Sequence, residues 1–208
     1  MLNELFVRYP CLVSCQAEIQ HAADALIVCY QNGGKVMACG NGGSCADADH
    51  IVGELMKGFL KKRPLSDNLK QSMKEKSPSL DDMLLSRLQQ GLPALSLCSF
   101  AALNTAFCND ADPELIYGQA VLGMGKPKDV LICISTSGNA KNVFAAAKIA
   151  KALGITVIGL TGHGGGRLNE IADICIRVPE TDTYKIQELH LPVYHYLCAA
   201  TEAHFFPE

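Results

Sequence analysis

A seventeen-residue stretch, CGNGGSCADADHIVGEL at positions 39–55, combines three kinds of chemistry. A glycine-rich turn comes first and the hydroxyl of Ser44 follows it. An imidazole and a carboxylate then stand four residues apart, at His50 and Glu54. Free backbone N–H groups at the start of a helix bind anions, and residues four apart share one helix face. The stretch therefore predicts an anion-binding turn followed by a pair suited to proton transfer or metal binding.

A second turn repeats the first in outline. VLICISTSGN at positions 130–139 runs, like KVMACGNGGS at positions 35–44, from an apolar strand into a turn with glycine and serine. Its hydroxyls belong to Ser135, Thr136 and Ser137. Neither turn has the Lys-Ser/Thr of a P-loop or a GxGxxG fingerprint, so a small phosphate monoester is favoured over a nucleoside triphosphate. Ordinary helix capping explains either turn alone, whereas two such turns at strand ends favour a shared ligand.

The last part of the chain holds further candidates. IQELHLPVYHYLCAATEA at positions 186–203 carries Gln187, Glu188, His190 and His195. A histidine among tyrosines and leucines is more often a satisfied core residue, and a His-xxx-Glu pair is more often simply exposed. The apolar neighbours of the His50 pair, and its place directly after the anion-binding turn, favour a functional site.

Apolar strands alternating with helices are expected to position these residues. Runs of continuous apolar character predict buried strands at 35–39, 94–97, 129–135, 155–161 and 173–179. Helices are expected at 46–59, up to 106, at 113–123, 140–153, 168–172 and 184–205, after an N-terminal helical region at 3–31. The fold class is therefore α/β, a single domain with a doubly wound, mostly parallel sheet flanked by helices.

Residues 61–93 interrupt this alternation. The segment is polar, charged and broken by prolines, so it is interpreted as an insertion over the surface with a helix at 81–90. Both its ends are expected near the pocket, and one hypothesis is a lid that brings Arg63 or a nearby lysine to a bound phosphate. A solvated surface loop is the alternative.

The composition limits what the 208 residues can do. Hydrophobic residues make up 49% and charged residues 19%, a balance on the apolar side that often accompanies subunit contacts. The formal net charge of −3 gives no electrostatic case for nucleic acid or an anionic membrane surface. Ten scattered cysteines are expected to be buried thiols. No apolar run reaches the ~20 residues of a membrane span and the N-terminus lacks a secretory pattern, so a cytoplasmic protein is expected.

Three motifs resemble those of one known family. GNGGSxxDAxHxxxEL, ISTSGN and IQExHxxxxH together are similar to the phosphoheptose isomerases, a branch of the sugar isomerase (SIS) fold family. The resemblance covers most of the chain apart from about residues 61–93. It implies an SIS fold, a homotetramer with active sites at subunit interfaces, and one zinc ion per subunit. The implied reaction converts sedoheptulose 7-phosphate to glycero-manno-heptose 7-phosphate through an enediol.

The same resemblance implies the site residues. The metal ligands would be His50, Glu54, Gln187 and His195, and the acid/base pair Glu54 and His195. The substrate would be bound by Asn41, Gly42, Gly43, Ser44, Asn109, Asp110, Ser135, Thr136, Ser137 and Gln187. Gln187 and His195 lie ~12 Å apart along one helix. Both side chains reach one ion only if Gln187 lies at a bent helix start. Otherwise another subunit contributes a ligand. His190 is the reserve ligand.

Two departures from the family pattern leave the exact sugar open. Ala140 stands where the family has a serine, and Tyr184 stands where it has an aspartate. One alternative is an isomerase for another sugar phosphate. Another is a noncatalytic SIS protein that binds a sugar phosphate or a protein partner, as the replication-initiator-associating homologue does. A regulatory sensor fused to a DNA-binding domain is disfavoured because the chain has no basic patch for one.

Overall fold

Five parallel strands form the centre of the computed structural model, which describes residues 2–207. The strand order is β2-β1-β3-β4-β5, and every neighbouring pair is parallel. The strands are β1 (Val36–Cys39), β2 (Ala94–Ser96), β3 (Val130–Ile134), β4 (Thr156–Thr161) and β5 (Ile174–Arg177). All five predicted strands and the predicted fold class are therefore confirmed, with only small shifts at the strand ends.

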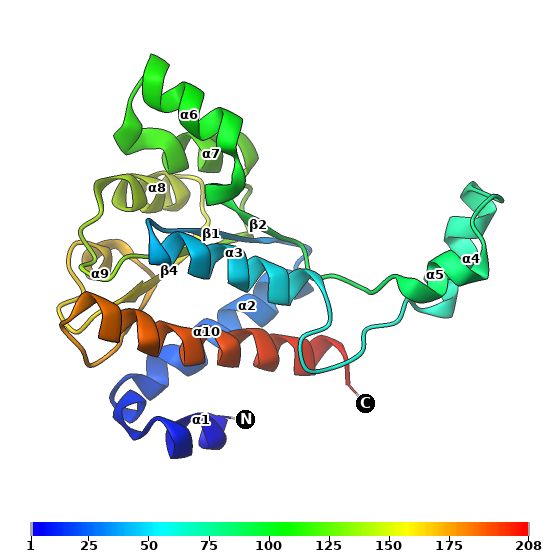
Figure 1. Cartoon of the computed structure of the whole chain (residues 1–208), viewed down its shortest axis with the longest axis horizontal. Helices are drawn as coiled ribbons and strands as arrows, with labels where there is room; N and C mark the ends of the chain where they lie inside the picture. The colour runs from blue at the N-terminus through cyan, green and yellow to red at the C-terminus, as the bar shows by residue number, and fades with distance from the viewer. Residues whose placement is uncertain (1, 208) are drawn as a thin grey trace.

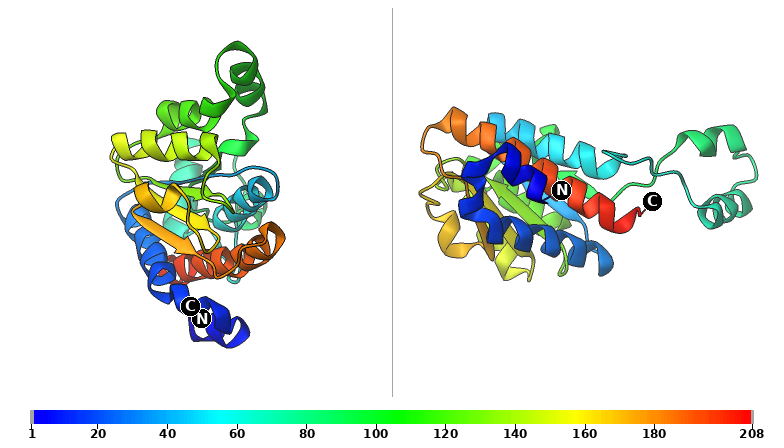
Figure 2. Two further views of the ribbon diagram at one scale, coloured as in Figure 1. Left: turned by 90° about the vertical axis from the view of Figure 1, so that its left-hand side faces the viewer. Right: turned by 90° about the horizontal axis from the view of Figure 1, so that it is seen from below.

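Helices cover both faces of this sheet, because its strands send alternate apolar side chains to opposite sides (Figure 1). On β1, Val36 and Ala38 belong to one core and Met37 and Cys39 to the other. The first core lies under α1 (Leu2–Arg8), the 3-10 helix η1 (Pro10–Cys15), α2 (Gln16–Gln31), α3 (Gly43–Met56) and α10 (Thr183–Phe205). The second lies under α7 (Ile116–Met124), α8 (Lys141–Ala152) and α9 (Leu168–Ile171). Figure 2 shows α1, α2 and α10 together on one side of the sheet.

The strand order reverses between β1 and β3. The chain leaves β1 into α3 on one face and leaves β3 into α8 on the other, and Cys39 pairs with Cys133 at the strand ends. In open parallel sheets, ligands bind in the crevice that such a reversal opens at the carboxyl ends of the strands. Both turns singled out in the sequence lie at this place.

Helices α3 and α10 lie side by side and run in the same direction. Near their starts, Gln187 of α10 lies against Gly43 of α3. Further along, His50 and Tyr194 are in contact although 144 residues separate them in the sequence. The candidate residues of the two motifs therefore lie on neighbouring helices.

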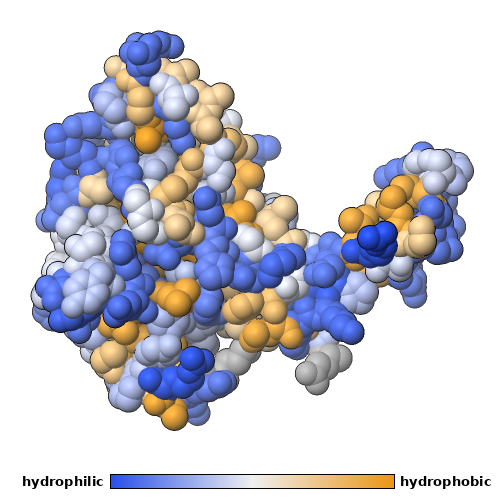
Figure 3. Space-filling model, in the orientation of Figure 1, coloured by the Kyte–Doolittle hydropathy of each residue, from blue (hydrophilic) through white to orange (hydrophobic). Residues whose placement is uncertain are grey.

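Residues after α3 extend away from the body of the molecule as an arm (Figure 1). It holds α4 (Asp67–Lys76) and α5 (Asp82–Arg87), whose first turns are capped by the side chains of Ser66 and Asp81. The sequence predicted only the second of these helices, because α4 is too polar to show a helical apolar pattern. Figure 3 shows apolar side chains on the visible face of the arm. Met83 of α5 is 69% exposed.

Three short helices complete the chain between β2 and α7. They are η2 (Leu97–Ser99), α6 (Ala101–Asp110) and η3 (Pro113–Leu115). Within residues 2–207, the structure has no helix both long and apolar enough to cross a membrane.

Candidate active site

The first turn joins β1 to α3 and presents backbone rather than long side chains. Gly42 adopts a positive φ of 56°, which favours glycine, and it caps the start of α3. Ser44 lies buried in the first turn of the helix and donates its N–H to Asn41 O at 3.1 Å. A Cβ at position 43 would lie 2.6 Å from Gln187 Nε2, so glycine is what allows the Gln187 side chain to approach.

The second turn joins β3 to α8 and is held by its own hydroxyl groups. Ser137 Oγ accepts a hydrogen bond from Asn139 N at 3.2 Å, and Ser135 Oγ accepts one from Ala140 N at 3.4 Å. Gly138 has a φ of 67°, and a Cβ there would collide with the carbonyl of Gly165. The glycine-rich loop after β4 therefore packs directly against this turn. Thr136 belongs to the same contact, since its carbonyl accepts the N–H of Gly162.

The two turns are joined by a pair of amide side chains. Asn41 and Asn142 exchange two hydrogen bonds, at 2.9 and 3.0 Å, and Tyr117 Oη donates to Gly40 O at 2.6 Å. These contacts place the turns next to each other across the crevice between β1 and β3. The sequence analysis missed Asn142 and Tyr117. Asn142 carries a local signal, since it follows the second turn at the start of a helix, whereas Tyr117 carries none.

The carboxylate of Glu54 lies between the side chains of His50 and Lys57. Its Oε1 is 3.2 Å from His50 Nε2, and its Oε2 accepts a hydrogen bond from Lys57 Nζ at 2.8 Å. The Glu54 side chain is only 13% exposed, whereas that of His50 is 41% exposed. Lys57 was not among the expected residues, although its position one turn after Glu54 is the kind of signal that could have found it.

His195 brings a second imidazole to the same surface. Its ring centroid lies 5.0 Å from that of His50 and 5.4 Å from that of Phe59. His195 Nε2 is buried and has no hydrogen-bond partner in the described part of the chain. Burial, and then the nearby His50, lower the pKa of His195, which favours a neutral imidazole with a free lone pair.

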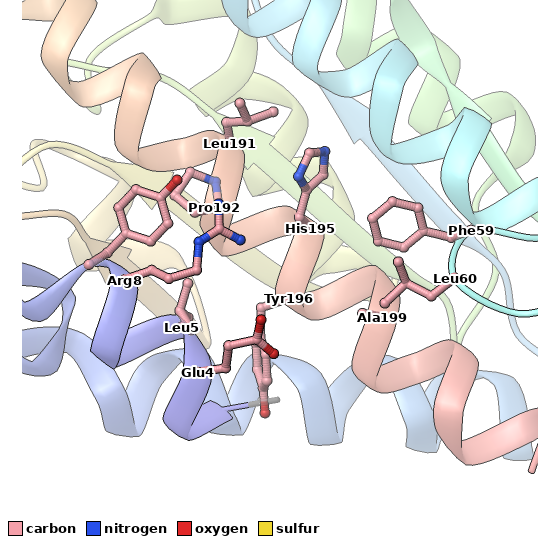
Figure 4. Close-up of a pocket in the computed structure, with 11 residues that line it drawn as sticks. Glu4, Leu5, Arg8, Phe59, Leu60, Leu191, Pro192, His195, Tyr196 and Ala199 are labelled. Carbon is pink, nitrogen blue, oxygen red and sulfur yellow. The ribbon is translucent and has the colours of Figure 1, made fainter.

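A cavity of about 390 Å³ adjoins His195. It lies between α1 and α10, and Figure 4 shows the His195 ring between Leu191 and Phe59 with the Arg8 side chain extending from α1. The charge of Arg8 also contributes to lowering the pKa of His195. The cavity therefore opens on the α1 side of the His50, Glu54 and His195 cluster rather than at the strand-end turns.

Comparison with known proteins identifies the family. The family model for the SIS domain matches residues 12–90 and 86–162. The chain is 39% identical to a phosphoheptose isomerase of Rhodospirillum rubrum over 96% of its own length and 90% of that protein's. The chain belongs to the phosphoheptose isomerase family. It is also 36% identical to the phosphoheptose isomerase of Helicobacter pylori, over 93% of this chain and 88% of that one.

Solved structures of the family have the same fold. Phosphoheptose isomerase GmhA from Neisseria gonorrhoeae superposes with a TM-score of 0.71 at 31% identity, covering 89% of this chain and 86% of that one. A phosphoheptose isomerase from Francisella tularensis gives a TM-score of 0.73 at 32% identity, covering 89% and 85%.

The metal ligands that the resemblance implied are only partly assembled. As the side chains stand, no group of three or more His, Cys, Asp or Glu within residues 2–207 is arranged to hold a metal ion. His50, Glu54 and His195 nevertheless lie together, and Gln187 lies apart against Gly43. Two imidazoles and a carboxylate are a donor set that zinc accepts, and Nε2 of His195 has no other partner in the described residues. The residues present therefore fit a zinc ion in chemical type.

His190 is not a reserve ligand, and that expectation was wrong. Its side chain is fully buried against the sheet, and neither ring nitrogen has a hydrogen-bond partner among residues 2–207, although the backbone of Thr161 lies nearby. His195 lies on the other side of α10, because five residues turn a helix by well over a full turn.

Two of the expected substrate contacts lie on α6. Asn109 and Asp110 lie exposed at the end of α6, where Asn109 Nδ2 donates to Asp110 Oδ1 at 2.7 Å. Figure 1 places α6 beside α7, on the side of the sheet opposite α10. Within one chain, these residues are not brought to Glu54 or His195.

The hypothesis that Arg63 approaches a bound phosphate is also wrong. Arg63 is buried at the root of the arm and forms an ion pair with Glu202, with Nε to Oε1 at 2.7 Å. It also donates to the carbonyls of Leu55 and Glu54, at 2.7 and 3.1 Å. Glu202 in turn accepts the N–H of Phe59 at 2.8 Å and those of the next two residues. Arg63 therefore fixes the end of α3 to α10, behind the Glu54 carboxylate.

Proposed function

We propose that this chain is a phosphoheptose isomerase that interconverts sedoheptulose 7-phosphate and glycero-manno-heptose 7-phosphate through an enediol. The observation that carries the proposal is the Glu54 carboxylate, which accepts a hydrogen bond from Lys57 and lies beside His50, with the neutral His195 next to them. Such a reaction moves a proton between two adjacent carbons, and it needs a carboxylate at the carbon and a second group for the oxygens. Membership of the phosphoheptose isomerase family supports the same reaction.

Each side chain has a role in this proposal. Glu54 removes the proton from carbon and returns it to the neighbouring carbon. His195, kept neutral by burial, transfers protons to and from the substrate oxygens, as a neutral imidazole does in other isomerases. Lys57 holds the carboxylate in place and brings a positive charge to the position where the enediolate develops.

A zinc ion belongs to the proposal. His50, Glu54 and His195 would hold it, and Gln187 would join them either by leaving Gly43 or from another subunit. When bound, zinc supplies positive charge that polarises the substrate oxygens. Elemental analysis of untagged protein should then find about one zinc per chain. Protein that remains free of transition metal after zinc is offered would contradict this ligand set.

The strand-end turns would bind the phosphate. They supply backbone N–H groups at the starts of α3 and α8 together with the hydroxyls of Ser44, Ser135, Thr136 and Ser137. The crevice position of both turns supports this role. Asn109 and Asp110 would contribute from a neighbouring subunit.

A distance argument supports active sites shared between subunits. Glu54 follows Gly43 by eleven residues of α3, which is ~16 Å along the helix axis. With C–C bonds of about 1.5 Å, an extended heptose phosphate spans only roughly 9 Å from C2 to phosphorus. An active site shared between subunits would place the turn of one chain close to the Glu54 of another, as the proposed homotetramer requires. Exposed apolar residues on α1 and after α3, such as Val7 and Leu60, provide surface for such contacts.

Incubating the purified protein with sedoheptulose 7-phosphate in D2O tests the proposed reaction. Proton NMR should show the aldose phosphate appearing with deuterium at C2, because the proton on Glu54 exchanges with solvent. Pentose and hexose phosphates serve as comparison substrates, and conversion of one of these alone would show that the sugar is wrong. Binding without turnover of any of them would favour a noncatalytic SIS protein. A monomer by light scattering at micromolar concentration would contradict the shared site.

A further inference from the structure

A chain of hydrogen bonds connects His50 to a carboxylate that the proposed reaction does not use. Tyr194 Oη lies 3.0 Å from His50 Nδ1 and donates to Asp47 Oδ1 at 3.2 Å. Tyr194 is 1% exposed, and its ring meets the rings of both His50 and His195 edge-on, at centroid distances of 5.4 and 5.1 Å. The second carboxylate oxygen, Asp47 Oδ2, is buried without a partner in residues 2–207.

When Asp47 is ionised, the hydrogen bonds from His50 through Tyr194 to Asp47 can have only one donor-to-acceptor order. Burial raises the pKa of Asp47, while the hydrogen bond from Tyr194 and the nearby His50 oppose that rise and favour the carboxylate. A carboxylate only accepts hydrogen bonds, so the single proton of Tyr194 Oη must point toward Asp47. The oxygen of Tyr194 is then an acceptor for His50, and the His50 proton lies on Nδ1.

The order of donors and acceptors in these hydrogen bonds decides whether His50 Nε2, which faces Glu54, carries a proton or a lone pair. With its proton on Nδ1, neutral His50 carries a lone pair on Nε2, and this atom lies 3.2 Å from Glu54 Oε1. Two acceptors at that distance repel each other unless a cation lies close to both. The arrangement therefore suits a divalent cation better than a direct hydrogen bond.

We propose that Tyr194 and Asp47 are positioning residues that hold His50 as its Nδ1–H tautomer and aim Nε2 at the cation site beside Glu54. The proposal rests on the proposed isomerase site and adds two residues that support it from behind. Outer hydrogen bonds of this kind fix both the tautomer and the ring orientation of a metal-binding histidine. Neither residue touches the substrate in this role.

Tyr194→Phe is the most direct test, because it keeps the ring packing on both imidazoles and removes only the hydroxyl. Zinc affinity, measured by competition with a chelator, should fall by about 10- to 100-fold. The kcat should fall with it, while KM should stay near its wild-type value because the phosphate turns are untouched. Tyr30→Phe is the matched control, since Tyr30 Oη of α2 also donates one hydrogen bond, but to Pro93 O and not to a residue of this site.

Nitrogen NMR of histidine-labelled, metal-free protein at pH 8 reads the tautomer directly. The protein has six histidines, and the His50 signals are identified by their loss in His50→Gln. Wild type should show His50 protonated on Nδ1. Tyr194→Phe should show a mixture of tautomers, and Asp47→Asn should do the same, since an amide can face Tyr194 with its oxygen or its NH2 group.

The results of these experiments distinguish failure of the positioning role from failure of the proposed isomerase function. His50 protonated on Nε2 in the wild type, or unchanged zinc affinity and tautomer in a folded Tyr194→Phe, would overturn the positioning role. Wild-type protein that shows the Nδ1–H tautomer but neither binds zinc nor isomerises a sugar phosphate would overturn the proposed function and leave the hydrogen-bond chain in place. If Tyr194→Phe does not fold, Asp47→Asn decides, because it preserves the shape of the side chain.

Discussion

The strand-end turns and the outer surface of α3 and α10 are built in different ways. The turns consist of backbone groups and short hydroxyls, whose positions follow from the register of β1 and β3 and from glycines at positive φ. The α3–α10 surface consists of long side chains in mutual contact, from Lys57 through Glu54 and His50 to Tyr194. The turns should therefore tolerate loss of one side chain, whereas the α3–α10 surface should not.

The largest effect is expected for Glu54→Gln. The amide keeps the shape of the carboxylate but cannot accept the carbon-bound proton, so kcat should fall by roughly 10²- to 10⁴-fold. Isomerase assays measure kcat for this variant. Glu170→Gln, at an exposed glutamate of α9, is the control. Near-normal turnover in Glu54→Gln would show that Glu54 is not the base, and that the α3–α10 surface does not carry the proton transfer.

The buried Arg63–Glu202 ion pair lies behind Glu54, and breaking it should lower the free energy of unfolding strongly. Arg63→Leu leaves Glu202 buried and unpaired, and losing one partner of a buried pair costs about 3–5 kcal/mol. Lys141→Met breaks the Lys141–Glu114 pair instead, whose side chains are 69% and 51% exposed, so its effect on stability should be much smaller. Urea unfolding of both variants at one protein concentration gives the two values. Equal losses would mean that burial of the pair is not what matters.

His190 of α10 should make the stability of the protein depend on pH. Burial lowers its pKa from 6.5 to about 4, so the folded protein disfavours the charged imidazole. The unfolded chain binds the proton first, and stability should fall as the pH drops from about 6.5 to about 4. The loss should be about 3 kcal/mol, at 1.36 kcal/mol per pKa unit.

His190→Leu isolates this effect, since its side chain cannot be protonated. Unfolding free energies of the two proteins at pH 7 and pH 4.5 should show a smaller acid loss for the variant. An equal slope would place the acid sensitivity elsewhere in the structure.

The same contrast explains what the sequence could predict. Buried strands, glycine turns and the shared face of His50 and Glu54 depend on residues close together in the chain, so periodicity and spacing were sufficient. The burial of Arg63 was not predictable, because it sits in a polar segment and its partner Glu202 is 139 residues away. Periodicity placed His190 and His195 on one helix but could not show which of them faces the sheet.

The smallest effect is expected in the turns, for Ser137→Ala. In the free protein the hydroxyl accepts the N–H of Asn139, and in the proposed complex it would donate to the phosphate. Loss of one such hydrogen bond costs about 1 kcal/mol, so KM should rise by roughly fivefold with kcat unchanged. Binding that is equal in the ground and transition states changes only KM.

Ser14→Ala is the control, because Ser14 Oγ makes a similar local hydrogen bond to Cys11 O on η1. Steady-state kinetics on both variants give kcat and KM separately. A fall in kcat at constant KM for Ser137→Ala would mean that the second turn takes part in the chemical step. The division between an anchoring turn and a reacting helix pair would then be wrong, even if Glu54 proved essential.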